Sequence, residues 1–273
     1  MSGVIIAAIV VGAAGIGLGF FLAFMSKKFA VEVDEREAQV RELLPGNNCG
    51  ACGYPGCDGA ATAMCKGEAP ANACPVGGPD VASKIAEILG GEAGESVKKV
   101  AFVKCAGDCD KAKDLYEYSG VKTCAIVATA PGGGSKGCSY GCRGYGDCVE
   151  ACEFDAIHIV NGIAVVDRDK CVACEACVKS CPKRLIEMIP YKRTAAVECA
   201  SNDMGKEVMA VCQAGCIGCK ICEKECPIPD GGAIHVEKNI AKVDYAKCVG
   251  CGKCAAKCPK KVIKMFTIKN VKK

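Results

Sequence analysis

Residues 171–182 read CVACEACVKSCP, with four cysteines inside eleven positions and a proline after the last. The same C-x2-C-x2-C-x3-C-P spacing recurs at 216–227 and 248–259, in a chain of 273 residues that holds 26 cysteines. Thiols are reactive and are seldom kept at this density for packing alone. Soft thiolates select iron–sulfur clusters or zinc, but structural zinc needs two pairs on a longer loop. The spacing therefore favours [4Fe–4S] clusters over zinc or disulfides.

The chain around these motifs is duplicated. Residues 157–189 align without a gap on 234–266, and 16 of the 33 positions are identical. Each copy begins with a hairpin pattern, and in the first copy Asn161-Gly162 is a strong turn signal. This ligand run is typical of bacterial two-cluster ferredoxins, so two copies predict two tandem bacterial-ferredoxin-like (βαβ)2 domains.

In such a run the fourth cysteine binds the other cluster of the pair, which assigns the ligands by crossing. The last domain is predicted to hold one cluster on Cys216, Cys219, Cys222 and Cys258 and another on Cys226, Cys248, Cys251 and Cys254. The middle domain is less regular, because its first triplet is stretched and glutamate replaces proline after the fourth cysteine. Its predicted sets are Cys138, Cys142, Cys148 and Cys181, and Cys152, Cys171, Cys174 and Cys177.

The first cysteine-rich segment has a different spacing, C-x2-C-x4-C-x16-C. Its four thiols also suit one [4Fe–4S] cluster, although this spacing alone leaves zinc as an alternative: Cys49, Cys52, Cys57 and Cys74. Cys65 is expected to pack in a helix, and Cys109 receives no role. Four cysteines remain: Cys105, Cys124, Cys199 and Cys212. They could hold a sixth cluster, but we favour the alternative that they pack as buried thiols on strands.

The N-terminus predicts a membrane anchor. Residues 1–26 contain no charged side chain, and Lys27 and Lys28 follow. A helix of this length can cross the roughly 30 Å hydrocarbon core, and no basic start or cleavage site indicates a signal peptide. The positive-inside rule then places the cysteines in the reducing cytoplasm, where metal thiolates persist. We expect a single-pass protein of the cell membrane, in contact with membrane lipid.

Apolar residues at helical spacing predict helices over 34–46 and 78–91. The expected fold class is α+β, with a single N-terminal transmembrane helix, a small helical Fe–S domain and two tandem (βαβ)2 domains. The predicted boundaries are 1–28 for the anchor, 29–98 for the four-Cys domain, 99–137 for a linker or β segment, and 138–192 and 193–273 for the ferredoxin domains.

Motifs for other chemistry are missing from the sequence. It contains no phosphate loop, no G-x-G-x-x-G after a strand, and no evident catalytic triad or acid–base pair. We therefore expect no flavin or nucleotide on this chain, no independent active site and no nucleic-acid partner. The sequence predicts a protein that moves electrons through five [4Fe–4S] clusters.

The order of these modules, a span, then C-x2-C-x4-C-x16-C, then ferredoxin repeats, resembles the B subunit of the Rnf complex (RnfB) in its extended form. The resemblance covers essentially the whole chain. It implies a membrane complex that oxidises reduced ferredoxin, reduces NAD+ and translocates Na+ or H+. It also implies soluble ferredoxin as electron donor and other integral and peripheral subunits as partners, with flavins and the NADH site on those subunits.

Two other functions are open on the sequence. The same clusters could feed electrons to a membrane hydrogenase or another reductase. Alternatively, the thiols could hold zinc in a membrane-tethered scaffold, which would be colourless, whereas iron–sulfur protein is brown.

Overall fold

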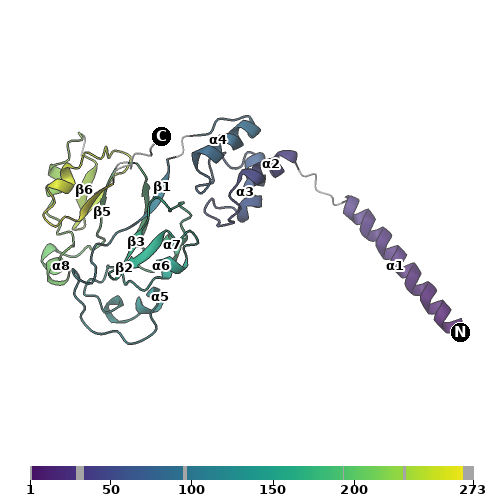
Figure 1. Cartoon of the computed structure of the whole chain (residues 1–273), viewed down its shortest axis with the longest axis horizontal. Helices are drawn as coiled ribbons and strands as arrows, with labels where there is room; N and C mark the ends of the chain where they lie inside the picture. The colour runs from purple at the N-terminus through teal and green to yellow at the C-terminus, as the bar shows by residue number, and fades with distance from the viewer. Residues whose placement is uncertain (1, 29–33, 95–96, 193, 230–231, 267–273) are drawn as a thin grey trace.

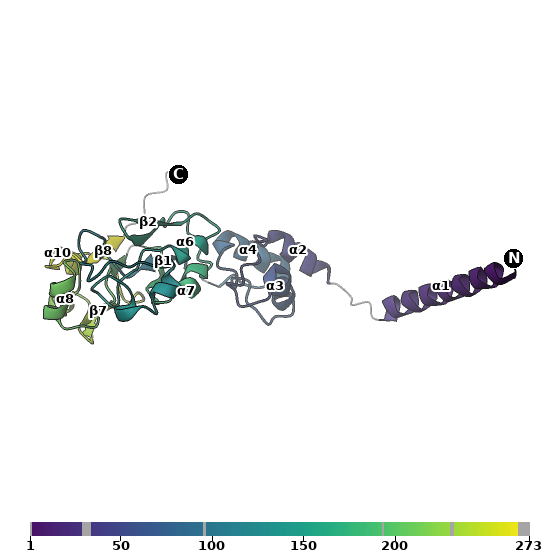
Figure 2. The same ribbon diagram turned by 90° about the horizontal axis from the view of Figure 1, so that it is seen from below.

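The computed structural model describes residues 2–28, 34–94, 97–192, 194–229 and 232–266. Helix α1 (Ser2–Lys28) has 27 residues, and its described apolar side chains other than Met25, such as Phe20, are exposed. It extends away from the remainder of the chain (Figures 1 and 2). Judged on the described residues alone, no helix is both long and apolar enough to cross a membrane. Met1 of the predicted anchor lies outside the described residues.

A small helical domain follows, made of α2 (Glu35–Leu43), α3 (Gly56–Cys65) and α4 (Gly78–Leu89). The two helices predicted over 34–46 and 78–91 are thereby confirmed. The Asp34 side chain caps α2, since Oδ1 accepts the N–H of Arg36 at 3.0 Å. One buried side chain from each helix forms the centre of this domain: Val40, Met64 and Ile85.

The first ferredoxin unit contains two small antiparallel sheets. Strand β1 (Lys99–Val103) pairs with β4 (Ile186–Pro190), and β2 (Ile157–Val160) forms a hairpin with β3 (Ile163–Val166). The predicted hairpin is confirmed, and Asn161 and Gly162 both have the positive φ that its two-residue turn requires. The segment predicted as a linker or β segment, 99–137, begins with a strand, because its first five residues form β1 of this unit.

The second unit repeats this arrangement. Strand β5 (Thr194–Val197) pairs with β8 (Ile263–Phe266), and β6 (Ile234–Glu237) forms a hairpin with β7 (Ile240–Val243). Short helices connect the strands of the two units. They are α5 (Cys124–Val127), α6 (Asp147–Glu150), α7 (Ala176–Ser180), α8 (Gly205–Val211), α9 (Ile221–Lys224) and α10 (Lys253–Ala256).

Backbone hydrogen bonds join the two units along one edge. The Ala106 N–H donates to the carbonyl of Glu198 at 3.0 Å, and the Lys113 N–H donates to the carbonyl of Val211 at 2.9 Å. The Phe102 and Phe266 rings, one from each unit, meet edge-on with their centroids 5.7 Å apart. The units therefore form one packed body, which Figure 1 shows beside the helical domain.

Cysteines occupy the core of each unit together with aliphatic side chains. Each sheet has only two strands, and such a sheet is marginally stable by itself. The core of the first unit includes Cys142, Cys148, Cys171 and Cys177, and that of the second includes Cys199, Cys216, Cys222 and Cys254. Because buried thiols lie in both cores, a group bound to them would be part of the packed core and would stabilise the fold.

We expect Ile189→Ala to lower the free energy of unfolding by about 2–5 kcal/mol, because truncation of a buried aliphatic side chain leaves a cavity. Ile189 is fully buried on β4, opposite the equally buried Val100. Anaerobic denaturant unfolding followed by circular dichroism measures the change. The control is Val160→Ala, at a side chain that is 54% exposed, where the change should stay within about 0.5 kcal/mol. Equal losses from both variants would contradict the packing described here.

Candidate metal centres

Two cavities of the second unit are each lined by four cysteines. One is surrounded by Cys216, Cys219, Cys222 and Cys258, and the other by Cys226, Cys248, Cys251 and Cys254. In each, three thiols come from a tight loop that runs into a short helix, α9 or α10, and the fourth comes from the other motif. The structure thus brings together the same crossed sets that the sequence predicts for this unit.

In the first unit one predicted set is also brought together. The pKa of the Cys177 thiol is raised to about 12, first by burial and then by its neighbours Cys171, Cys174 and Cys152. The sulfur of Cys171 accepts the N–H of Ala101 on β1 at 3.3 Å. Strand β1 therefore positions this group of thiols as well as closing the sheet.

The other predicted set of the first unit differs from the structure. The cavity beside α6 is lined by Cys124, Cys142, Cys148 and Cys181, and Cys124 stands where the sequence predicted Cys138. The reason is the Asp147 carboxylate, which accepts the N–H groups of Cys124 at 2.7 Å and Ala125 at 2.9 Å. These bonds hold the start of α5 against α6, which carries Cys148.

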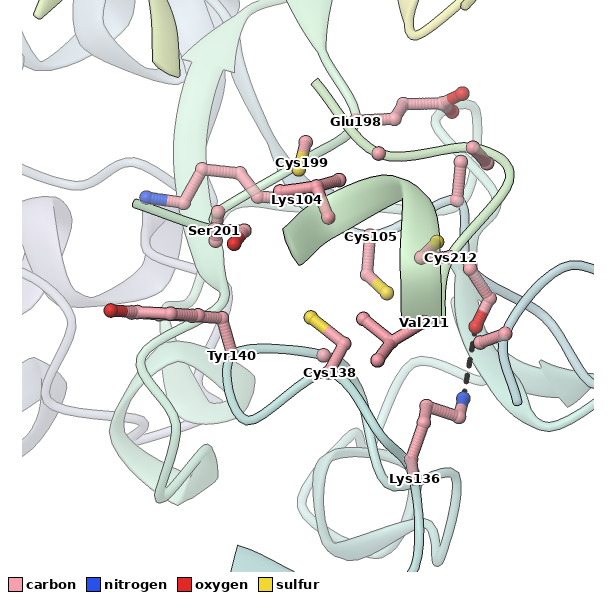
Figure 3. A pocket seen from close by; sticks show the side chains of 18 residues that line it. Lys104, Cys105, Lys136, Cys138, Tyr140, Glu198, Cys199, Ser201, Val211 and Cys212 are labelled. Carbon is pink, nitrogen blue, oxygen red and sulfur yellow. Dashed lines mark hydrogen bonds between the residues drawn. The ribbon is translucent and has the colours of Figure 1, made fainter. Parts of the chain in front are cut away.

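Cys138 instead lines a fourth cavity, which lies between the two units (Figure 3). Four thiols surround it, and they match the predicted sixth set except that Cys138 replaces Cys124: Cys105, Cys138, Cys199 and Cys212. Cys105 and Cys199 follow strands β1 and β5 rather than lying on them, which differs from the interpretation as strand thiols. Figure 3 shows the side chains of all four cysteines around this cavity.

The helical domain carries the first predicted set. Burial raises the pKa of the Cys74 thiol, and the neighbouring Cys52 and Cys57 thiols raise it further. Asn48 accepts the N–H of Cys57 through Oδ1 at 2.8 Å and so fixes the start of α3. Cys49 is exposed, and it lies close enough to Cys174 of the first ferredoxin unit to contribute to the raised pKa of that thiol.

The two cysteines without a predicted role lie outside these groups. Cys65 ends α3 and packs partly buried against the core of the helical domain, as expected. Cys109 is exposed.

The chemistry of the thiol groups fits iron–sulfur clusters. Burial, reinforced by neighbouring thiols, raises the pKa of Cys148 and Cys222 to about 12, yet only a thiolate is a ligand. Iron replaces the proton and thereby offsets this cost. Backbone N–H groups also donate to sulfur, as those of Leu185 and Ala233 do to Cys181 and Cys226 at 3.4 and 3.3 Å, and such bonds tune cluster potentials. Within the described residues no three His, Cys, Asp or Glu side chains are grouped closely enough for a single metal ion.

Three family models for iron–sulfur proteins match parts of the chain. The family described as "Putative Fe-S cluster" matches residues 44–76, which contain the four-Cys segment. The 4Fe-4S binding domain matches residues 164–187, and the 4Fe-4S dicluster domain matches residues 208–259. Both ferredoxin units are thereby covered in part.

Relatives extend over most of the chain. The B subunit of the Na(+)-translocating ferredoxin:NAD(+) oxidoreductase complex of Acetobacterium woodii is 48% identical over 86% of this chain and 70% of its own length. The B subunit of the ion-translocating oxidoreductase complex of Methanosarcina acetivorans is 43% identical over 89% of this chain and 92% of its own length. The B subunit of the proton-translocating ferredoxin:NAD(+) oxidoreductase complex of Clostridium ljungdahlii is 39% identical over 89% of this chain and 85% of its own length. The chain therefore belongs to the family of B subunits of the ion-translocating ferredoxin:NAD(+) oxidoreductase, or Rnf, complexes.

Proposed function

We propose that this protein carries electrons, one at a time, from reduced ferredoxin into an ion-translocating ferredoxin:NAD(+) oxidoreductase complex. The observation that carries this proposal is the series of thiol groups that continues from the helical domain through both ferredoxin units. When bound, [4Fe–4S] clusters supply one-electron transfer at potentials between about −700 and +450 mV. The protein would bind them through its thiols and donate backbone hydrogen bonds to ligating sulfur atoms.

Twenty cysteines would hold five of these clusters, in four-thiol sets. The sets are Cys49, Cys52, Cys57 and Cys74; Cys152, Cys171, Cys174 and Cys177; Cys124, Cys142, Cys148 and Cys181; Cys216, Cys219, Cys222 and Cys258; and Cys226, Cys248, Cys251 and Cys254. Neighbouring sets lie close together. Cys49 adjoins Cys174 across the domain boundary, and Cys177 contributes to the raised pKa of Cys148 within the first unit. This proximity supports transfer from one set to the next.

The other components of the reaction belong to partner subunits. The sequence contains no nucleotide-binding or flavin motif, which supports NAD+ reduction elsewhere in the complex. The names of the relatives include Na(+)-translocating and proton-translocating complexes, so they leave the ion undefined for this protein.

We place the complex in the cell membrane, with residues 1–28 as the anchor of this protein and its thiol sets on the cytoplasmic side. The 27 residues of α1 rise about 40 Å at about 1.5 Å each, more than the roughly 30 Å of a hydrocarbon core. The absence of charge from residues 1–26 and the lysine pair after them support this topology.

The proposal is tested on the complex purified anaerobically in mild detergent. Reduced ferredoxin should bleach the iron–sulfur absorption of this protein and then reduce NAD+, whereas oxidised ferredoxin should do neither. The companions should carry flavin. Chemical reduction by dithionite serves as the control that the clusters are intact.

Three results would overturn the proposal. A nickel or molybdenum enzyme as the companion would make the protein the electron-input component of a hydrogenase or another reductase. A colourless, zinc-containing protein would make it a scaffold. Clusters that dithionite reduces but ferredoxin does not would exclude ferredoxin as the donor.

A further inference from the structure

We propose that Cys105, Cys138, Cys199 and Cys212 hold a sixth [4Fe–4S] cluster, which connects the two ferredoxin units, and that buried Lys136 is its counter-charge. The inference rests on the proposed function for the direction of electron flow, but not for the existence of the site.

The cavity between the units resembles the three cavities lined by ferredoxin-type sets. Its volume is about 20 Å³, as in those three, and like them it is lined by four thiols. The thiols form a connected group. Cys199 is next to Cys138, Cys138 to Cys212 and Cys212 to Cys105, since within each pair one thiol contributes to the raised pKa of the other. A Cβ added at Gly107 would lie 3.1 Å from the sulfur of Cys212 and 3.8 Å from that of Cys105, so glycine leaves both sulfur atoms room.

Each ferredoxin unit supplies two of these thiols. Cys105 and Cys199 follow the first strand of their units, β1 and β5, so they occupy equivalent places in the duplicated fold. Cys212 is held at the junction by a bridge to Ala112 and by the adjacent bond from the Gln213 N–H to the Lys111 carbonyl at 2.8 Å. The site is therefore complete only when both units are together.

Lys136 provides independent support for an anion in this cavity. Its side chain lines the cavity and is only 7% exposed. The ammonium group donates to the carbonyl oxygens of Gly107 at 2.9 Å and Gly162 at 3.4 Å (Figure 3 shows the first bond). In the described part of the chain no carboxylate forms an ion pair with it. A buried charge without a counter-ion is strongly unfavourable, and a cluster held by four thiolates supplies negative charge.

Arg143, which contacts the backbone of Lys136, repeats this pattern. It is 9% exposed and lines the neighbouring cavity of Cys124, Cys142, Cys148 and Cys181. Its guanidinium donates only to backbone carbonyls, among them that of Lys136 at 3.0 Å, and its Nε has no partner in the described structure. Two buried cations thus lie beside two neighbouring groups of thiols, which suits two adjacent anionic clusters.

The position of the site gives it a connecting role. The sulfur of Cys105 accepts the N–H of Cys142 at 3.4 Å, and Cys142 belongs to the nearest set of the first unit. The sulfur of Cys199 accepts the N–H of Cys216 at 3.4 Å, and Cys216 belongs to the nearest set of the second unit. On loading, each thiol loses its proton to solvent as it ligates iron. One electron released by ferredoxin then crosses this site from one unit to the other.

The test measures iron and acid-labile sulfide in the anaerobically purified full-length protein. We expect about 24 irons per chain rather than 20, since each cluster contains four. Cys138→Ala and Cys199→Ala should each remove about four irons, and the double variant should lose no more than either single one. Cys124→Ala combined with Cys138→Ala should lose about eight, because these residues serve different clusters. Cys109→Ala, at an exposed thiol outside every set, is the matched control and should keep all the iron.

The outcomes separate this inference from the proposed function. About 20 irons in the protein and no loss in Cys199→Ala would overturn the sixth cluster and leave the electron-transfer role intact, whereas absence of iron would remove both. A double variant that loses twice the iron of each single variant would also overturn the shared site.

A second readout tests Lys136 in a folded protein. Lys136→Gln keeps an N–H donor at this position, but the positive charge that favours the reduced cluster is lost. Redox titration followed by electron paramagnetic resonance should show that the reduction potential of one cluster becomes more negative by about 59 mV. For one electron this is about a tenfold change in the reduction equilibrium. Lys84→Gln, at an exposed lysine on α4 of the helical domain, is the control and should leave that potential unchanged. An unchanged potential for all clusters in Lys136→Gln would contradict the role of Lys136.

Discussion

Removal of iron from the protein is expected to abolish the cooperative unfolding of the two ferredoxin units. Their four sheets contain only two strands each, and eight cysteines occupy the two cores. Without bound iron these thiols cannot ionise in the core, and the cavities that they surround stay unfilled. Since metal binding contributes directly to folding and native domains are stable by only about 5–15 kcal/mol, the loss should exceed about 5 kcal/mol.

The measurement is anaerobic chelation under reducing conditions, followed by circular dichroism and by hydrogen exchange of the backbone amides. The amides of Ile189 on β4 and Ile263 on β8, which are buried in the two units, should lose their protection. Incubation with the reductant alone is the control and should leave both protected. If the iron-free protein kept both amides protected and still unfolded in one transition, the cores would be stable without clusters.

Cys177→Ala is expected to have the largest effect on electron transfer. Cys177 is buried within the group of Cys152, Cys171 and Cys174, and this group adjoins Cys49 of the helical domain. Loss of its cluster should remove about four irons and separate the helical domain from the ferredoxin units. Electron transfer between the two parts should fall by about 100-fold or more, since replacing even an outer-shell residue of a metal site costs about 10–100-fold.

Rapid mixing with reduced ferredoxin, with freeze-quench spectroscopy of the clusters, measures this effect. The clusters between the point where soluble ferredoxin delivers its electron and the missing cluster should still be reduced quickly. The clusters beyond the missing one should be reduced slowly. Cys65→Ala removes a partly buried thiol of α3 outside every set, so it should leave both iron content and rate unchanged. Equal rates on both sides of the gap in Cys177→Ala would show that electrons reach the clusters by another route.

Local patterns in the sequence predict the regular parts of this protein. The hairpin turns, the two helices of the small domain and the crossed thiol sets of the last unit all depend on residues within one motif or its duplicate. The strand Lys99–Val103 lies in the segment predicted only as a linker or β segment, because a single strand shows no partner in the sequence. Its partner, β4, lies more than eighty residues further along the chain.

The exchange of Cys124 and Cys138 could not be predicted from spacing. Cys138 precedes Cys142 by four residues, which resembles a ferredoxin run, whereas Cys124 lies far outside it. What decides the grouping is three-dimensional: the carboxylate of Asp147 holds the N-terminus of α5. The burial of Lys136 likewise has no sequence signal, since lysine is usually exposed.

The equivalent placement of Cys105 and Cys199 limits how this chain can be rebuilt. Each ferredoxin unit presents a thiol edge that the other unit covers, so neither unit is a free-standing module. An engineered chimera that exchanged one unit for an ordinary ferredoxin would keep that module's own cofactors yet leave an open, oxidisable edge on its neighbour. The two copies must therefore be transplanted as a pair.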